Sequence, residues 1–433
     1  MKTINASEFN LYWTKTETTQ DENVTPAIME IINAVRERGD EAVKEFAAKF
    51  DRSSPDTFEV PFAKMKAAYE ELKQEDASLV NALELAKKNI SAFAKLQREQ
   101  FSDFETEIAP GIFTGQKVIP VNRAAIYVPA GRFPLISSVL MGVIPALAAG
   151  VKEIFVVSPP LEDGLPDKRI MAAAYISGAH KCFAIGGAQA IAALAIGTET
   201  IPQVDVIAGP GNKYVAGAKR ILFGKVGIDF VAGPTDVLII SDGSEATTLE
   251  EAASLAARDM LAQAEHDPDA RARILVPNMQ LAKLVESELS KQLETLSTAS
   301  IAKQSLDAGG LIIIYDSIDE AVRIANIIAP EHLELQVKDA DKYISGLHNY
   351  GSLFIGIRAV EALGDYSAGI NHTLPTSGSA RFTGGLSVRH FLKTPTTLRC
   401  TNGSGLDDSL SAAEIIANAE GLAGHAASAA SRK

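Results

Sequence analysis

The segment RAAIYVPAGR, residues 123–132, passes from an apolar run to a proline and a glycine, and a long alanine- and leucine-rich stretch follows it. The same pattern, an apolar run that ends in proline or glycine, recurs in EIFVVSPP (153–160), KCFAIGG (181–187) and VDVIAGPG (204–211), each followed by an alanine-rich segment. Short β-rich runs that alternate with helical segments predict parallel strands joined by crossover helices. The sequence therefore predicts a doubly wound α/β unit in this region.

A second series of β-rich runs begins after Phe230, and it predicts a second α/β unit with a parallel sheet. Its runs are DVLIIS (236–241), ARILVP (272–277), LIIIYD (311–316) and LELQV (333–337). Between Thr25 and Gln100, apolar residues recur every three to four positions, which is typical of amphipathic helices. The last stretch, residues 387–433, is expected to be helical and too small to fold alone, so we expect it to pack on a partner chain.

The bulk composition excludes several classes of protein. The chain has 433 residues, 46% of them hydrophobic, and a formal net charge of −13, which argues against a nucleic-acid partner. Cys182 and Cys400 are too few for a disulfide framework and form no CxxC pair. The longest apolar run, residues 137–151, is interrupted by Pro145 and too short to span a bilayer. We expect a cytoplasmic protein without a membrane anchor.

The segment LAQAEHDPDA, residues 261–270, ends a helical pattern that begins at Thr248 and Glu251 with the spacing of a capping box. Gln263 and His266 are three residues apart, and both continue the apolar stripe of that helix. Two interpretations are open. The two side chains are either a buried polar pair with hydrogen-bond partners, or half of a metal site that needs another histidine and a carboxylate.

Two further segments combine histidine with a carboxylate. IAPEHLEL (328–335) places Glu331 beside His332 just before a predicted strand, where they are either surface charges or paired proton-transfer groups. GDYSAGINHTLPT (364–376) is a glycine- and asparagine-rich loop that carries Asp365 and His372, and such loops often line sites.

Signals for phosphate binding are weak, because the chain contains neither GxGxxG nor a P-loop motif. AIGGAQAIAALA (184–195) and IAGPGNKYVAGAKR (207–220) each read as strand, glycine turn and helix. Such turns either direct backbone N–H groups at an anion outside the carboxyl end of the sheet, or contain glycine for steric reasons alone.

Several of these motifs together resemble histidinol dehydrogenase. They are YVPAGR, GGAQAIAALA, GTETIP, GPGNKYV, GIDFVAGPTD, AQAEHDPDA, APEHLEL, GDYSAGINHTLPTSGSARF and GLSV, and the resemblance runs from about Asn122 to His425. It implies a zinc-dependent enzyme that oxidises L-histidinol to L-histidine through bound L-histidinal, with NAD accepting two successive hydrides, as the last step of histidine biosynthesis. It also implies a homodimer with shared active sites and one Zn²⁺ per subunit.

The resemblance assigns a role to each matching residue. The implied zinc ligands are Gln263, His266, Asp365 and His425, and the implied catalytic pair is His332 for the alcohol proton and Glu331 for activating water. NAD contacts fall on Tyr127, Gln189 and Asn212. The substrate pocket is implied to contain the ligands and the catalytic pair together with Thr235, His372 and Glu420. Glu420 and His425 are implied to enter the partner's site.

The fold class that follows is two doubly wound, Rossmann-like α/β domains with parallel sheets, plus small N-terminal and C-terminal helical segments that pack on the partner subunit. The predicted division has an N-terminal helical arm at 1–24 and a first α/β domain formed by 25–127 and 235–386, with most of the zinc and catalytic residues. The NAD-binding domain is predicted at 128–234 and the C-terminal helical dimerisation segment at 387–433. Two alternative functions are a related enzyme that oxidises another small polar alcohol, such as a sulfonated diol, and a non-catalytic protein that zinc stabilises.

Overall fold

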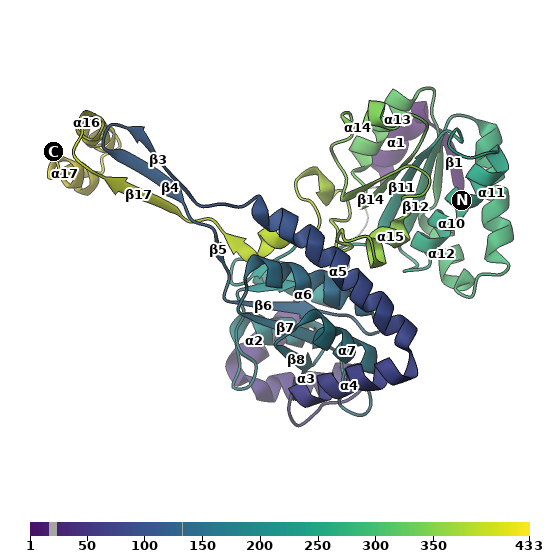
Figure 1. Cartoon of the computed structure of the whole chain (residues 1–433), viewed down its shortest axis with the longest axis horizontal. Helices are drawn as coiled ribbons and strands as arrows, with labels where there is room; N and C mark the ends of the chain where they lie inside the picture. The colour runs from purple at the N-terminus through teal and green to yellow at the C-terminus, as the bar shows by residue number, and fades with distance from the viewer. Residues whose placement is uncertain (17–23, 132) are drawn as a thin grey trace.

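Two six-stranded sheets, each covered by helices on both faces, make up most of the protein (Figure 1). The computed structural model describes residues 1–16, 24–131 and 133–433. Each β-rich run of the sequence forms a strand, and the strands of each series lie in one sheet. The predicted α/β fold with two parallel sheets is therefore confirmed.

The first sheet is wholly parallel, in the order β1-β13-β12-β11-β14-β15. Its strands are β1 (Lys2–Asn5), β11 (Asp236–Ser241), β12 (Arg271–Val276), β13 (Leu311–Ile314), β14 (His332–Gln336) and β15 (Ser352–Ile355). One face packs on α10 (Leu249–Ala264), α11 (Met279–Leu293) and α12 (Ala299–Gly309). The other face packs on α1 (Ala6–Thr16), α13 (Ile318–Ile328) and α14 (Asp341–Ile344).

Helix α10 begins where the capping-box spacing predicts. The hydroxyl of Thr248 accepts from the N–H of Glu251 (3.1 Å), and the carboxylate of Glu251 accepts from the N–H of Thr247 (2.8 Å). Because α10 follows the carboxyl end of β11, its last turn returns to the amino edge of the sheet. This places Gln263 and His266 beside the starts of β11 and β14.

The second sheet has the order β10-β9-β6-β7-β8-β2, parallel except for the short edge strand β2. Its strands are β2 (Glu59–Val60), β6 (Arg123–Tyr127), β7 (Glu153–Ser158), β8 (Lys181–Ala184), β9 (Val206–Ala208) and β10 (Gly227–Ile228). One face is covered by α4 (Phe62–Glu75), α5 (Ala77–Glu99), α6 (Ile136–Ala149) and α7 (Lys168–Ser177). The other is covered by α2 (Thr25–Arg38), α3 (Asp40–Phe50), α8 (Gly187–Ile196) and α9 (Lys213–Leu222).

The structure differs from the predicted division for residues 25–127. These residues were assigned to the first domain together with 235–386, but α2 to α5 pack on the second sheet, and β6 is one of its central strands. The apolar stripes of these helices indicate that one face is buried. They do not indicate which sheet buries it.

The N-terminal segment also differs from its prediction as an arm that packs on the partner. β1 forms the edge strand of the first sheet, with Lys2 paired to Leu311, and the side chain of Phe9 in α1 is completely buried in the same unit. Residues 17–23 of the predicted arm lie outside the described residues. KTIN is a short run of mixed polarity, so no strand signal distinguishes it.

An arm extends away from both units (Figure 1). It consists of the antiparallel sheet β17-β4-β3 and of the C-terminal helices α16 (Ser404–Ala419) and α17 (Ala423–Ala430). The strands are β3 (Phe104–Ala109), β4 (Ile112–Gln116) and β17 (Thr396–Cys400), and the pair β5 (Ile119–Pro120) and β16 (Leu392–Lys393) lies at the base. The helices of the predicted C-terminal segment are confirmed, but β17 and the β3–β4 hairpin were not predicted.

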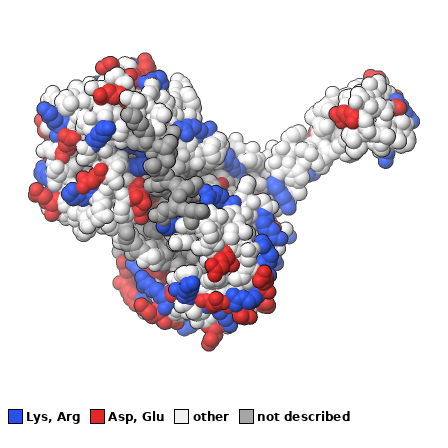
Figure 2. All heavy atoms as spheres, turned by 180° about the vertical axis from the view of Figure 1, so that it is seen from behind, with Lys and Arg blue, Asp and Glu red and all other residues white. Residues whose placement is uncertain are grey.

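Charged side chains of both signs are interspersed over the two α/β units, whereas the arm shows few of them in the same view (Figure 2). Six large apolar residues of the arm are exposed, namely Phe104, Ile108, Leu398, Ile415, Ile416 and Leu422. Exposed apolar groups that cluster in this way mark interaction surfaces. Within the described ranges, no helix is long and apolar enough to cross a membrane.

Packing of α1 on its own sheet predicts a large stability effect. We expect Phe9→Ala to lower the free energy of unfolding of the first unit by about 3–5 kcal/mol, the usual range for a fully buried phenylalanine. Urea unfolding can be followed by the fluorescence of Trp13, the single tryptophan, whose ring stacks on Phe9 at 5.4 Å. Leu11→Ala, on the exposed side of the same helix, is the matched control. A similarly small loss for both variants would contradict this packing.

Candidate active site

A cavity of about 160 Å³ lies between the two α/β units. The first unit contributes polar residues to its wall, among them Glu331, His332 and Asp365, and the second contributes Ser138 and Pro210. The first unit presents the amino ends of β11 and β14 to the cavity, because Thr235 precedes β11 and Glu331 precedes β14. The second unit presents the loop that follows the carboxyl end of β9.

Glu331 is held at the amino edge by contacts with the start of β11. Its carboxylate accepts from the hydroxyl of Thr235 (2.5 Å) and from the N–H of Asp236 (3.0 Å). Burial raises the pKa of Glu331 to about 7, and the charge of His332 partly opposes this rise. A carboxyl group with a pKa near neutrality can exchange a proton with a ligand at physiological pH. The alternative of a surface charge is wrong for Glu331 and for His332, because both are buried.

The imidazole of His332 has one engaged nitrogen and one free nitrogen. Nδ1 lies 3.3 Å from the carbonyl oxygen of Asp236, so Nδ1 carries the proton in the neutral ring. Nε2 is buried, lies 3.5 Å from Asp365 Oδ1, and has no hydrogen-bond partner among the described residues. Burial alone would lower the pKa of His332, but the carboxylates of Glu361, Glu331 and Asp365 raise it well above its ordinary value. Without a cation the carboxylates thus favour the protonated ring, whereas a cation bound beside Glu361 and Asp365 would oppose this rise and leave Nε2 free to accept a proton.

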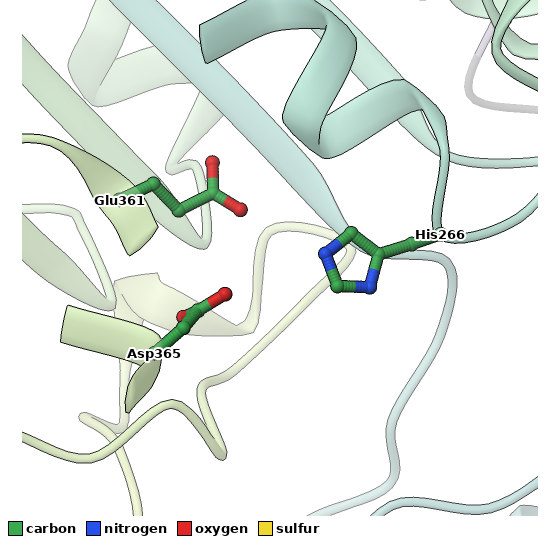
Figure 3. A group of neighbouring side chains, drawn as sticks. All are labelled: His266, Glu361 and Asp365. Carbon is green, nitrogen blue, oxygen red and sulfur yellow. The ribbon is translucent and has the colours of Figure 1, made fainter. Parts of the chain in front are cut away.

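A group of metal-ligating side chains lies beside this imidazole. Potential ligand atoms of His266, Glu361 and Asp365 lie within 4.8 Å of one another, and the three side chains converge from α10's end and from α15 (Glu361–Tyr366) (Figure 3). Burial raises the pKa of Glu361 to about 8, with a further rise from Asp365. Because unpaired carboxylates are costly to bury together, this arrangement suits a bound cation.

The side-chain amide of Gln263 joins the same cluster. One of its terminal atoms lies 2.8 and 3.0 Å from the two carboxylate oxygens of Glu361, and the other lies 2.7 Å from Thr235 Oγ1. Without a cation the amide nitrogen faces Glu361, whereas with one the oxygen can face the cluster while the nitrogen donates to Thr235. The carbonyl end of α10 also points toward the cluster and favours a positive charge. The donor set therefore fits a divalent metal such as zinc.

His372 connects the two units. Its Nδ1 lies 2.9 Å from the carbonyl oxygen of Asp365, and its Nε2 lies 3.0 Å from the hydroxyl of Ser138 in α6. Nδ1 therefore carries the proton, and Nε2 accepts from the serine. Burial lowers the pKa of His372. His372 lines the cavity with both ring nitrogens already in use.

The three residues implied to contact NAD lie in the second unit, on β6 and at the two glycine turns. Tyr127 and Gln189 are buried, and Asn212 caps α9 by accepting from the N–H groups of Tyr214 and Val215. The hydroxyl of Tyr127 accepts from the N–H of Gly187 (3.1 Å).

At the two glycine turns, for which an anion site and a purely steric role were both open, backbone N–H groups are already bonded to the protein's own side chains. Asp51 accepts from the N–H of Gly186 (3.1 Å) and from the amide of Gln189 (3.3 Å). The hydroxyl of Tyr127 accepts from the N–H of Gly187 in the same turn, and at the other turn Asn212 accepts from the N–H of Val215. The steric interpretation of the glycines is therefore favoured over direct phosphate binding. Asp51 was missed because it lies far from the turn in sequence.

Glu420 and His425 do not reach the cavity of their own chain. Both are exposed on the helical end of the arm, and α17 lies far from β14 and α15 (Figure 1). The structure thus brings together Thr235, Gln263, His266, Glu331, His332, Asp365 and His372, and separates Glu420 and His425 from them. Glu361 was not predicted as a site residue, although its position four residues before Asp365 places both on one face of a helical turn.

Comparison with known proteins gives one consistent family. Residues 14–433 match the family described as histidinol dehydrogenase. Histidinol dehydrogenase of Thermus thermophilus is 45% identical over 409 residues, which cover 94% of each chain. That of Bacillus cereus is 45% identical over 406 residues, covering 94% of this chain and 92% of the relative. The crystal structure of histidinol dehydrogenase from Elizabethkingia anophelis has a TM-score of 0.91 at 32% identity, covering 100% of this chain and 98% of that one.

The cluster geometry predicts the effect of removing one carboxylate. We expect Glu361→Gln to weaken zinc binding at least about tenfold, because it removes a negative charge beside the cation. Competition with a chelating dye measures the affinity. Glu265→Gln is the control, because the carboxylate of Glu265 accepts from Thr298 instead. Equal zinc affinity in wild type and Glu361→Gln would contradict a role for this residue.

Proposed function

The chain belongs to the histidinol dehydrogenase family, and from this premise we propose that it oxidises L-histidinol to L-histidine with NAD, through L-histidinal held in the site. The observation that carries the proposal is the pairing of a free imidazole nitrogen on His332 with a carboxyl group of near-neutral pKa on Glu331, beside a cluster suited to a cation. Such a site holds a base for each of two successive oxidations. In this role the protein would catalyse the last step of histidine biosynthesis.

The first oxidation uses His332. Its Nε2 takes the hydroxyl proton of the alcohol while the hydride leaves the carbon for the nicotinamide, so the alcohol loses two electrons and becomes the aldehyde. The hydrogen bond between Nδ1 and the Asp236 carbonyl fixes the ring orientation during this transfer. NADH and one proton are the other products.

The second oxidation uses Glu331. Its carboxylate takes a proton from water as the water oxygen bonds to the aldehyde carbon, and the former carbonyl oxygen takes up a proton from solvent, which gives the hydrate. The hydrate loses a hydride to a second NAD and a hydroxyl proton to a neighbouring base, and it becomes the carboxylic acid of L-histidine. Thr235 and the N–H of Asp236 hold the Glu331 carboxylate in place for this step.

The residues that would hold zinc are Gln263, His266 and Asp365 of one chain and His425 of the partner subunit. When bound, zinc supplies a fixed point for the imidazole and amino nitrogens of the substrate. Glu361, which lies in the same cluster, would add a negative charge beside the cation.

A homodimer with shared sites would account for the arm. The arm carries exposed apolar residues and ends in the helices that contain Glu420 and His425, at a distance from the cavity of its own chain (Figure 1). Docking on a second copy would cover the apolar surface and deliver both residues to the other site.

The test of the function is a stoichiometric assay of the zinc-loaded dimer. With L-histidinol and excess NAD, we expect about two NADH for each L-histidine formed, since each oxidation removes one hydride. A panel of other polar alcohols, including a sulfonated diol, tests the related activity. Preference for another alcohol would assign the protein to that reaction, and zinc binding without NADH formation from any alcohol would indicate a non-catalytic protein.

The near-neutral pKa of Glu331 predicts the pH dependence of the second oxidation. Because the carboxylate is the active form and its pKa is about 7, the rate from supplied L-histidinal should rise with pH through that value and then level off. Glu331→Gln should lose this dependence and slow the step at least about a hundredfold. Stopped-flow NADH absorbance measures both.

The matched variant is His332→Asn, which should instead slow the first hydride transfer from L-histidinol. Equal losses in both half-reactions for both variants would contradict the division of roles.

Sharing of the site predicts complementation between two inactive variants. Co-expression of His425→Ala with His266→Ala should yield mixed dimers with one complete site. In such a dimer both substitutions fall in one of the two sites, and the other site has all its native residues. Random pairing makes half of the dimers mixed, so activity should approach about a quarter of wild type. Tagged chains allow the mixed dimer to be isolated. No activity in the isolated mixed dimer would show that His425 does not act across the interface.

A further inference from the structure

A buried ion pair lies behind the loop that follows β9. The ammonium of Lys219, in α9, contacts the carboxylate of Asp229, and the two side chains are 2% and 0% exposed. Burying two charges costs more than a surface pair, and their attraction offsets that cost only with good geometry and further hydrogen bonds. The further hydrogen bonds of this pair therefore indicate what it does in the fold.

The pair holds both polar groups of one residue, Gly209. The carboxylate of Asp229 accepts from the N–H of Gly209 (2.8 Å), and the ammonium of Lys219 donates to its carbonyl oxygen (2.9 Å). The other carboxylate oxygen of Asp229 accepts from the N–H of Phe230 (2.8 Å). Gly209 has φ +110°, and a Cβ atom there would collide with the carbonyl oxygen of Tyr127. The loop is thus fixed against the end of β6.

This loop lies where an open α/β sheet binds its ligand. The chain runs from β6 to β7 and β8 on one side, and then returns to β9 on the other side of β6, so the strand order reverses between β6 and β9. Ligands of doubly wound sheets bind outside the carboxyl ends at such a point. Pro210 and Phe230, which directly follow Gly209 and Asp229, line the cavity that contains Glu331 and His332.

We propose that Lys219 and Asp229 are positioning residues for NAD: the ion pair fixes the loop 209–212 and Phe230 as the wall against which the nicotinamide end of the dinucleotide binds. Neither residue is among the described residues that line the cavity, so the pair acts through the two loops. A preformed wall lowers the ordering cost of binding the dinucleotide. The inference rests on the proposed use of NAD, and it adds the residues that make that site rigid.

The test is the double variant Lys219→Met/Asp229→Asn in the zinc-loaded dimer. It leaves no unpaired buried charge, and the new amide can still accept from Gly209, but nothing donates to the Gly209 carbonyl. We expect the dissociation constant of NADH, from its fluorescence, and the KM for NAD to rise about tenfold or more, the scale of a lost hydrogen bond to a charged group. The zinc content and the KM for L-histidinol should stay near wild type.

Met65→Ala is the control for stability alone. Met65 is completely buried in α4, on the opposite face of the second sheet, and should lower the melting temperature without changing NADH affinity. If the double variant does not fold, Gly209→Ala tests the same loop from its other side, by the collision with Tyr127, and should weaken NADH binding selectively.

Unchanged NADH affinity in a folded loop variant would overturn the proposal. An equal loss of NADH and L-histidinol binding, matched by Met65→Ala, would also overturn it, because it would indicate a general loss of structure. Failure of the proposed function is distinguishable, because the wild-type protein itself would then form no NADH from L-histidinol.

Discussion

The concentration of buried carboxylates around one imidazole is the constraint that organises the first unit. Glu331, Glu361 and Asp365 all raise the proton affinity of His332, and each is itself buried. Such a cluster is unstable unless protons, hydrogen bonds or a cation compensate its charge. The chain supplies partners for Glu331 from Thr235 and Asp236, and leaves Glu361 and Asp365 beside the ligand atoms of His266 and Gln263. A cation bound between these side chains would compensate the charge of Glu361 and Asp365, which is the largest remaining cost of burying the cluster.

The N-terminal segment helps to compensate buried charge at the same edge, and it does so from the other face of the sheet. Asp236 accepts from the N–H of Glu331 and pairs with the buried guanidinium of Arg273 at 3.3 Å. The guanidinium lies over the ring of Trp13 in α1, 5.1 Å from its centre. Burial raises the pKa of Asp236, and the charge of Arg273 opposes this rise. The first helix of the chain therefore supports the carboxyl group that holds the start of β14.

The sequence predicted the central strands of both sheets and the start of α10, because these depend on local patterns. Alternation of apolar runs with helical periodicity is visible within short windows, and the capping box at Thr248 depends on four residues. What the sequence did not reveal depends on long-range contacts. The stripe of α5 fits either sheet, the pairing of β1 with β13 joins residues about 300 apart, and Asp51 reaches the turn at Gly186 across the fold. The resemblance supplied the site residues that spacing alone left open.

The boundary between the two α/β units separates the two tasks of the proposed reaction. The amino edge of the first sheet carries Glu331, His332 and the cluster of His266, Glu361 and Asp365, whereas the carboxyl edge of the second sheet carries the loop at Gly209. Two hydrogen bonds across this boundary fix the position of one edge relative to the other. They run from Ser138 to His372 and from Asn371 to the carbonyl of Met141. In the proposed reaction, an aldehyde held by the first unit would then remain in place while one dinucleotide leaves the second unit and another binds. Two oxidations in one cavity require this independence, because the intermediate must outlast the exchange of the oxidant.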